Sequence, residues 1–161
     1  MNIIDEFDFE KLDYQPIKKE YVKVMYFNTL WFGLIMGIGL GVFFYFNDVE
    51  WYTWAMAYLG VLVLMILKLI YNRAEIKNRL YFVGNQFVVY RSGLFLLTTE
   101  IVPFSRIQHT SLNQGWLSKK LGLASVSVFT AGNDDTSIKI KGLSLDEAKK
   151  MNSFILNHLE E

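Results

Sequence analysis

Two long apolar segments, separated by only four residues, constrain this chain more than any other feature. The 23 residues from Val24 to Phe46 include no charged side chain, and the 21 residues from Trp51 to Tyr71 include only Lys68. At about 1.5 Å per residue, a helix of the first segment would be about 34 Å long, enough for a hydrocarbon core of about 30 Å. We therefore predict a transmembrane hairpin with spans at residues 24–46 and 51–71.

The basic residues near this hairpin predict its orientation. They are Lys18, Lys19 and Lys23 before the first span, and Lys68, Arg73, Lys77 and Arg79 at the end of the second. The four-residue link has none, so the positive-inside rule places both termini in the cytoplasm and the link outside. Arg73, Lys77 and Arg79 are also candidate contacts for anionic lipid, each worth about 1 kcal/mol near such a surface.

Three glycines recur every four residues in the first span: Gly33, Gly37 and Gly41. This spacing aligns a stripe of small residues on one helix face and lets a second backbone approach closely. The stripe either seats the second span or forms a seam between copies of the chain. We predict the first of these uses.

Composition limits what else the chain contains. Its 161 residues allow one hairpin and one small domain. Sixteen basic and sixteen acidic residues balance, so no overall field draws the protein to nucleic acid. The absence of cysteine excludes disulfides, thiolate metal sites and a cysteine nucleophile.

Residues 80–161 are predicted to form the small domain, because from Leu80 onward the pattern alternates with a period of two. Strands are expected at 80–83, 87–91, 94–102, 106–112, 124–128 and 138–141, with a short helical excursion at 114–121. Ser144 and Glu147 form the capping box of a final amphipathic helix. The fold class is thus an α+β membrane protein, in which an open barrel or sandwich of antiparallel strands is closed by a C-terminal helix.

The remaining segments are an arm and a stalk. Residues 1–23 form an acidic arm with no helical face, interrupted at Pro16, and it either packs on the domain through its aromatic residues or is a disordered tail. The second helix is expected to continue past the bilayer to about Asn78 as a rigid stalk, so that residues 24–79 form hairpin and stalk together.

One surface patch is a candidate site. Trp116, Lys119 and Lys120 either face a membrane or a partner, or consist of a tryptophan packed into the domain edge beside two solvated lysines. His109 and His158 have no second ligand or nucleophile at a useful spacing, and Asp134–Asp135 is typical of a turn. We expect no catalytic, metal or cofactor site and no small-molecule substrate.

Five short motifs between Pro103 and Gly132 resemble the bacterial pleckstrin-homology-like (bacterial PH domain) family. They are a proline-led strand at Pro103, Ile107-Gln108, Gln114-Gly115, Leu121-Gly122-Leu123-Ala124 and Thr130-Ala131-Gly132. More narrowly, two spans followed by one such domain are similar to the YdbS-like membrane proteins. The resemblance implies two nearly orthogonal antiparallel sheets capped by a helix, in a protein of the bacterial inner (cytoplasmic) membrane.

The resemblance implies less about activity. Some members are linked to cell-envelope stress and to resistance to membrane-active peptides, so we expect a non-enzymatic membrane protein whose domain is a module for protein interaction or self-assembly. The alternatives are a lipid-sensing or lipid-binding protein and an accessory subunit of a transporter. Inositol-phosphate binding is not expected, because the loop Val83–Phe87 lacks the cations that pair with phosphates in PH domains of that kind.

Overall fold

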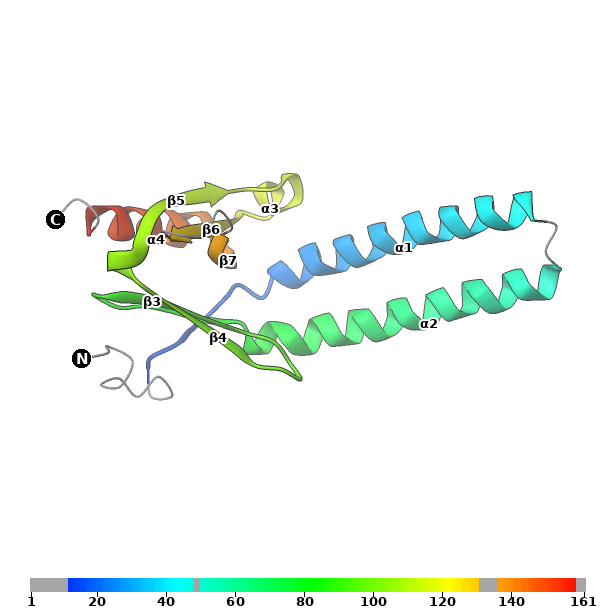
Figure 1. Cartoon of the computed structure of the whole chain (residues 1–161), viewed down its shortest axis with the longest axis horizontal. Helices are drawn as coiled ribbons and strands as arrows, with labels where there is room; N and C mark the ends of the chain where they lie inside the picture. The colour runs from blue at the N-terminus through cyan, green and yellow to red at the C-terminus, as the bar shows by residue number, and fades with distance from the viewer. Residues whose placement is uncertain (1–11, 48–49, 131–135, 159–161) are drawn as a thin grey trace.

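The structure, a computed structural model, describes residues 12–47, 50–130 and 136–158, and it consists of a helical hairpin that extends from one end of a β-rich domain (Figure 1). Helix α1 spans Tyr21–Phe46 and α2 spans Trp51–Glu75. The 3-10 helix η2, Ile76–Asn78, follows α2 directly, which is the continuation that was predicted as a stalk. The predicted α+β architecture is confirmed.

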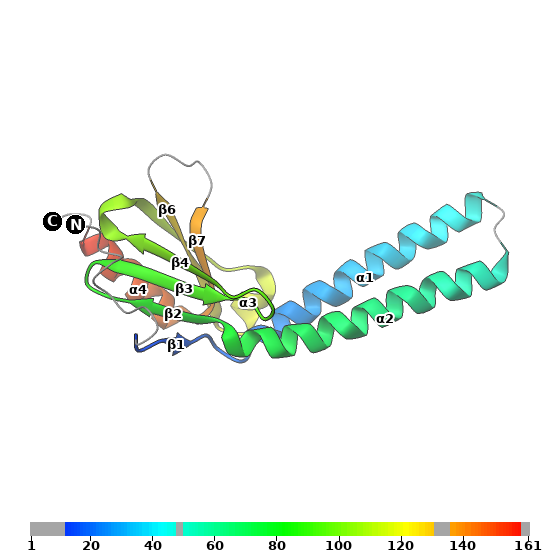
Figure 2. The same cartoon turned by 60° about the horizontal axis from the view of Figure 1, so that its bottom comes forward.

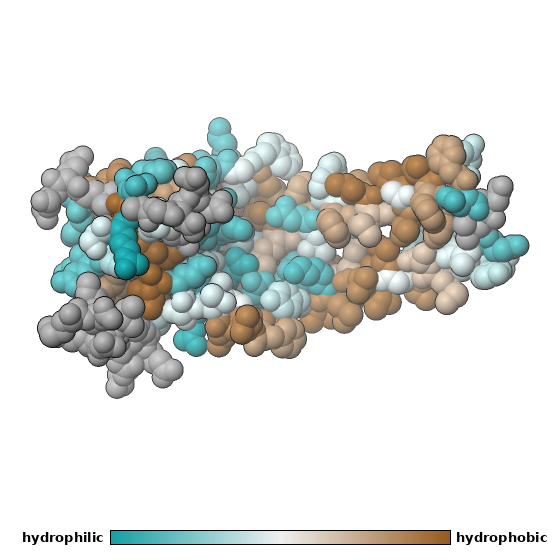
Figure 3. Space-filling view, in the orientation of Figure 1, coloured by the Kyte–Doolittle hydropathy of each residue, from teal (hydrophilic) through white to brown (hydrophobic). Residues whose placement is uncertain are grey.

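Both helices are long and apolar enough to cross a membrane, and their most apolar windows are only 11% and 0% buried inside the protein. The core helix of a soluble protein would be mostly buried. Figure 3 shows the apolar surface gathered over the hairpin and the hydrophilic surface over the domain. Large apolar side chains therefore cover the outside of the hairpin, where lipid is the solvent that suits them.

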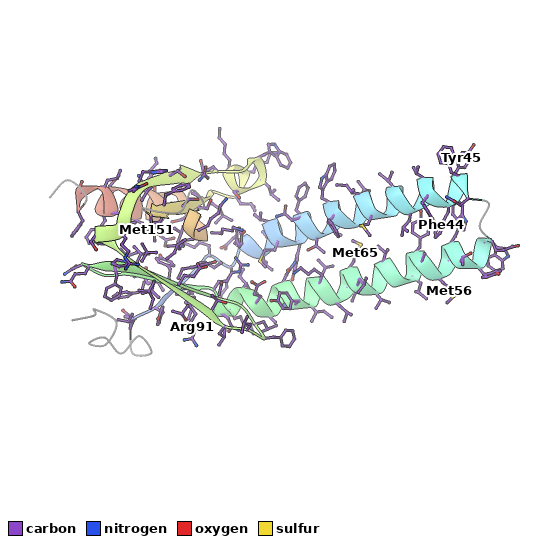
Figure 4. All side chains as sticks on the ribbon, viewed as in Figure 1. Phe44, Tyr45, Met56, Met65, Arg91 and Met151 are labelled. Atoms are coloured by element: carbon purple, nitrogen blue, oxygen red, sulfur yellow. The ribbon has the colours of Figure 1, made fainter. Side chains whose placement is uncertain are left out.

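The glycine stripe of α1 faces α2. Gly33 is buried, and a Cβ atom there would overlap Met65 of α2, whose side chain lies between the two helices in Figure 4. The Tyr58 hydroxyl donates a hydrogen bond to the Gly37 carbonyl at 2.9 Å, and a Cβ at Gly41 would lie 2.9 Å from the same hydroxyl. The stripe thus provides the close approach that the seating of the second span requires.

The domain contains two antiparallel sheets. The first has the order β1-β2-β3-β4, with strands Gln15–Pro16, Leu80–Val83, Phe87–Ser92 and Thr98–Pro103. The second has the order β5-β6-β7, with strands Ile107–Asn113, Leu123–Thr130 and Thr136–Ser144. The 3-10 helix η3, Phe104–Arg106, connects the first sheet to the second, and the short helix α3, Trp116–Lys120, connects β5 to β6. Figure 2 shows β2, β3 and β4 in front of β6 and β7.

The C-terminal helix α4, Leu145–Asn157, packs against the second sheet and completes the core. The predicted capping box is present: the Ser144 side chain accepts from the Glu147 amide, and the Glu147 carboxylate accepts from the Ser144 amide. Ala148 and Ile155 of α4 are fully buried with Val126 and Ile140 of the sheet. One apolar stripe on α4 thus closes the barrel, as its periodicity predicted.

The third predicted strand differs from the structure. Its expected start was Leu94, but β4 begins at Thr98, and the residues between form an exposed loop. Gly93 has a φ of +112°, where a side chain would be strained, and it turns the chain immediately after β3. The apolar run after Gly93 was interpreted as a strand because its composition is that of a buried strand.

The described part of the N-terminal arm belongs to the domain. β1 pairs with β2, Ile17 is 4% exposed within the core cluster, and the Lys18 amide donates to the Gly142 carbonyl at 2.8 Å. Of the two open alternatives for this arm, residues 12–20 follow the packed one; residues 1–11 lie outside the described residues. The hairpin is therefore inserted between the first two strands, and residues 80–161 are not the whole β-rich domain.

Candidate membrane-facing surface and helix–domain junction

The loop between β3 and β4 carries the most exposed large apolar side chains of the domain. Phe95, Leu96 and Leu97 are 91%, 80% and 47% exposed. The loop lies beside α2, and the ring centroids of Phe95 and Tyr71 are 6.0 Å apart. Adjacent exposed apolar residues of this kind mark an interaction surface on a protein or a membrane.

Helix α3 carries the exposed Trp116 on the other side of the hairpin. Trp116 is 65% exposed, and its ring centroid is 6.1 Å from that of Phe27 in α1. The Lys120 ammonium lies 4.4 Å from the Trp116 ring centroid, and Lys119 is exposed beside it. Trp116 therefore contacts the hairpin through Phe27 and is largely exposed, rather than packed into the edge of the domain.

These two elements lie at the same level of the hairpin. Phe27 and Tyr71 belong to the predicted spans and lie near the ends from which the domain hangs. In Figure 1, α3 lies next to α1, and the β3–β4 loop lies next to α2. We call Phe95, Leu96, Leu97 and Trp116 the candidate membrane-facing surface, because these exposed apolar side chains lie beside the domain-side ends of the two predicted spans.

A polar cluster with Asn72 at its centre joins the two helices of the hairpin near the domain. Asn72 of α2 is 2% exposed, and its amide donates to Thr29 Oγ1 of α1 at 2.9 Å and to the Met25 carbonyl at 3.4 Å. The Thr29 hydroxyl donates to the same carbonyl at 3.0 Å. A buried amide is costly unless its hydrogen bonds are made, so this cluster fixes the two helices relative to each other where they leave the apolar zone.

One turn further along α2, an ion pair continues the cluster. Arg79 Nη2 lies 2.7 Å from Glu75 Oε1, and Arg79 Nη1 donates to the Tyr90 hydroxyl of β3 at 3.3 Å. Both side chains are largely buried, with 16% and 10% of their surfaces exposed. Burial raises the pKa of Tyr90, and the Arg79 charge opposes that rise. This pair ties the stalk to the first sheet.

An open cavity of about 320 Å³ lies at the junction. It is lined by residues of both helices, the stalk and β7: Tyr21, Met25, Asn28, Thr29, Phe32, Lys68, Asn72, Glu75, Arg79 and Lys141. Burial, with the charges of Arg79 and Lys139, lowers the pKa of Lys141. The Lys68 ammonium lies 4.6 Å from the Tyr71 ring centroid. The cavity thus gathers three cations around one carboxylate.

The predicted lipid contacts divide between this cavity and the surface. Arg79 lines the cavity, whereas Arg73 and Lys77 are exposed on the stalk. Lys68 was noted in the sequence only as a cation at the end of its span. Asn72 and Glu75 are polar residues three positions apart after a long apolar run, and this pattern could have located the junction. No local pattern identifies Lys141 of β7 as part of the cavity.

The two histidines lie against aromatic rings. The His109 ring stacks on Phe129 with centroids 4.3 Å apart, and His158 packs on Phe104 and Phe154. Within the described ranges, no group of three or more His, Cys, Asp or Glu side chains could hold a metal ion. Asp134 and Asp135, interpreted as a turn, lie outside the described residues.

Comparison with known proteins gives two matches. The family model described as Bacterial PH domain matches residues 30–159, which include most of the hairpin as well as the domain. The UPF0699 transmembrane protein YdbS of Bacillus subtilis (strain 168) is 31% identical over 125 residues, 76% of this chain and 76% of that protein. No solved structure matches the chain.

Proposed function

The chain belongs to the bacterial PH domain family, and from that premise we propose that it is a non-enzymatic protein whose PH-like domain is held against the bilayer by its hairpin end and serves as a binding module. The relative is a transmembrane protein, and both helices of this chain have the length and composition of spans. The finer proposal is that the domain does not hang free in solution: its hairpin end rests in the headgroup region.

The exposed β3–β4 loop is the observation that carries this proposal. Burying a large apolar side chain that water would otherwise surround is worth about 1.5–3 kcal/mol, and Phe95 and Leu96 are almost fully exposed in the protein alone. Trp116 adds an aromatic ring of the type that prefers the interface. With α3 beside α1 and the loop beside α2, the domain contacts the membrane on both sides of its anchor.

Depth measurements on the full chain in proteoliposomes test this docking. The sequence has no cysteine, so Leu96→Cys and Ser105→Cys each give one labelling site. Ser105 is exposed in η3, in the connection at the end of the domain away from the hairpin. A fluorophore on Leu96→Cys should be quenched by lipids that carry a nitroxide near the headgroup, and one on Ser105→Cys should not. Equal quenching at the two positions would contradict the docked domain.

Orientation is part of the proposal and has its own test. With both termini in the cytoplasm, Ser118→Cys in α3 should react with a membrane-impermeant maleimide only after the cells are opened. Labelling of that cysteine in intact cells would place the domain on the outer side.

Protein assembly is a second candidate, favoured by the first sheet. β4 is one of its two edge strands, and Thr98, Thr99 and Glu100 are exposed along it. An exposed edge of this kind accepts a strand from a partner or from another copy. Thr99→Pro should abolish such pairing without disturbing the core. Crosslinking of the full chain in membranes would detect the loss of pairing, and unchanged crosslinks would mean that β4 is not the assembly surface. The resemblance-based role in envelope stress and peptide resistance stays a prediction.

A further inference from the structure

The junction cavity continues into an apolar groove between the two helices. This groove has a volume of about 260 Å³ and is lined by Thr29, Phe32, Gly33, Met36, Val61, Leu64, Met65 and Lys68. Thr29, Phe32 and Lys68 also line the junction cavity. A single elongated molecule could therefore occupy both spaces, with a polar end near the domain and an apolar end along the hairpin.

The polar end of this site has an excess of positive charge. Lys68, Arg79 and Lys141 line the junction cavity together with one carboxylate, Glu75. Glu75 is held by Arg79 at 2.7 Å, which leaves two positive charges uncompensated. Within the described ranges, no acidic side chain makes an ion pair with Lys68 or Lys141. Lys141 is half-buried and Lys68 is exposed in the protein alone. An anion between these two lysines would offset the cost of burying Lys141 and would pair with both charges.

The apolar end faces lipid. Phe32 and Leu64, on either side of the groove, are 66% and 67% exposed in the protein alone. Both belong to the predicted spans, so hydrocarbon surrounds them in the membrane. A soluble anion would fill only the junction cavity, and a peptide would have to leave unpaired backbone groups in hydrocarbon.

We propose that the cavity and the groove together bind one anionic phospholipid, with its phosphate between Lys68 and Lys141 and one acyl chain along Phe32, Met36 and Leu64. The site lies between the hairpin and β7, so an occupied site joins the membrane anchor to the second sheet. It requires the hairpin to lie in lipid, as the proposed function has it, but it does not require the β3–β4 loop to touch the bilayer.

Native mass spectrometry of the full chain in neutral detergent measures this binding. The probes are phosphatidylglycerol, phosphatidylcholine and inorganic phosphate. One phosphatidylglycerol should bind per chain at least tenfold more tightly than phosphatidylcholine. The variant Lys68→Gln/Lys141→Gln should bind it about 30-fold more weakly, because each cation near an anionic group contributes about a fivefold factor.

Matched variants separate the site from general surface charge. Lys149 and Lys150 are exposed on α4, whereas the cavity is lined by the hairpin, the stalk and β7. The variant Lys149→Gln/Lys150→Gln removes the same charge and should change the affinity less than twofold. Met36 lines the groove, so Met36→Trp should weaken binding of phosphatidylglycerol. Ile38 is 60% exposed and does not line the groove, so Ile38→Trp should not weaken it.

Three results would overturn the proposal. They are equal affinity for the two lipids, an equal loss in the two double variants, and displacement of phosphatidylglycerol by millimolar inorganic phosphate, which would assign the cavity to a soluble anion. If the Lys68→Gln/Lys141→Gln protein does not fold, each single variant should still lose about fivefold in affinity. Failure here leaves the Leu96 depth result unaffected, so the lipid site and the docked domain are tested independently.

Discussion

Ile38 in the hairpin and Ile155 in α4 are the same side chain in opposite surroundings, since the first is 60% exposed in the isolated protein and the second is 0% exposed. The hairpin has its apolar side chains on the outside, and its helices meet along the glycine stripe, where Tyr58 and Met65 of α2 make contact, and at the Asn72 cluster. The domain has its apolar side chains inside, between two sheets and α4. The exterior of the hairpin therefore suits lipid, and the exterior of the domain suits water. The polar junction lies where these two surroundings meet.

The largest expected difference between the regions comes from the matched isoleucines. Ile155→Ala leaves a cavity in a close-packed core and should lower the free energy of unfolding of the domain by about 2–5 kcal/mol. Ile38→Ala should change it by less than about 0.5 kcal/mol, since only a lipid contact is lost. Thermal unfolding in detergent measures both changes. Similar losses for the two variants would contradict the contrast between an apolar exterior in the hairpin and an apolar interior in the domain.

The junction should be nearly as sensitive as the core. Glu75→Gln leaves the largely buried Arg79 guanidinium without its carboxylate and should cost about 2–3 kcal/mol. Arg73→Gln, on the exposed side of the same helix, is the matched control and should have little effect. Limited proteolysis near Asn78 would show whether the domain has separated from the stalk; equal digestion of the two variants would mean that the ion pair does not hold the junction.

Within the hairpin, the glycine positions should differ from one another. Gly33→Leu must displace Met65 and should weaken the helix–helix contact by about 1–2 kcal/mol. Gly39 has nothing within 4 Å of an added Cβ, so Gly39→Leu should be neutral. Distances between spin labels on the two helices would register the change. If Gly37→Leu instead dissociates an oligomer, the stripe also serves as a seam between copies.

The smallest effect is expected at the surface, where Lys18 of the arm lies 2.8 Å from Glu147 of α4. Burial alone would raise the pKa of Glu147, but hydrogen bonds from Lys18 and Ser144 outweigh it and leave the pKa below its ordinary value of 4.5. The stability from this pair is therefore present above about pH 4.5 and is lost as the pH falls below it.

Both partners are more than a third exposed, so this contribution should stay below about 1 kcal/mol. Unfolding of the parent chain and of Glu147→Gln should be compared between pH 7 and pH 3. The difference between them should shrink as the pH falls, and a difference that grew instead would mean that the carboxylate is not stabilised by Lys18.

Several structural features could not be predicted from local patterns. β1 has two residues, one of them Pro16, and proline is usually a strand breaker, although it is tolerated on an edge strand such as this one. Gly142 directly follows the predicted strand 138–141; its φ is +80°, and a Cβ there would lie 2.8 Å from the Tyr21 ring. β1 pairs with β2, and Gly142 of β7 lies against Tyr21. Both features depend on contacts between segments far apart in the chain, which the sequence of either segment alone does not indicate.

The two apolar helices, the end of the stalk, most strands and the capped final helix could be predicted from local sequence, because each depends on spacing within one segment: span length, period, turn residues and the capping box. Three features emerge only from the folded protein: the position of the arm, the exposed loop residues Phe95–Leu97 beside α2, and the meeting of Lys141 with Lys68 and Arg79 at one cavity. These features bring together residues from distant segments, and their positions depend on how the sheets close around the inserted hairpin rather than on any local propensity.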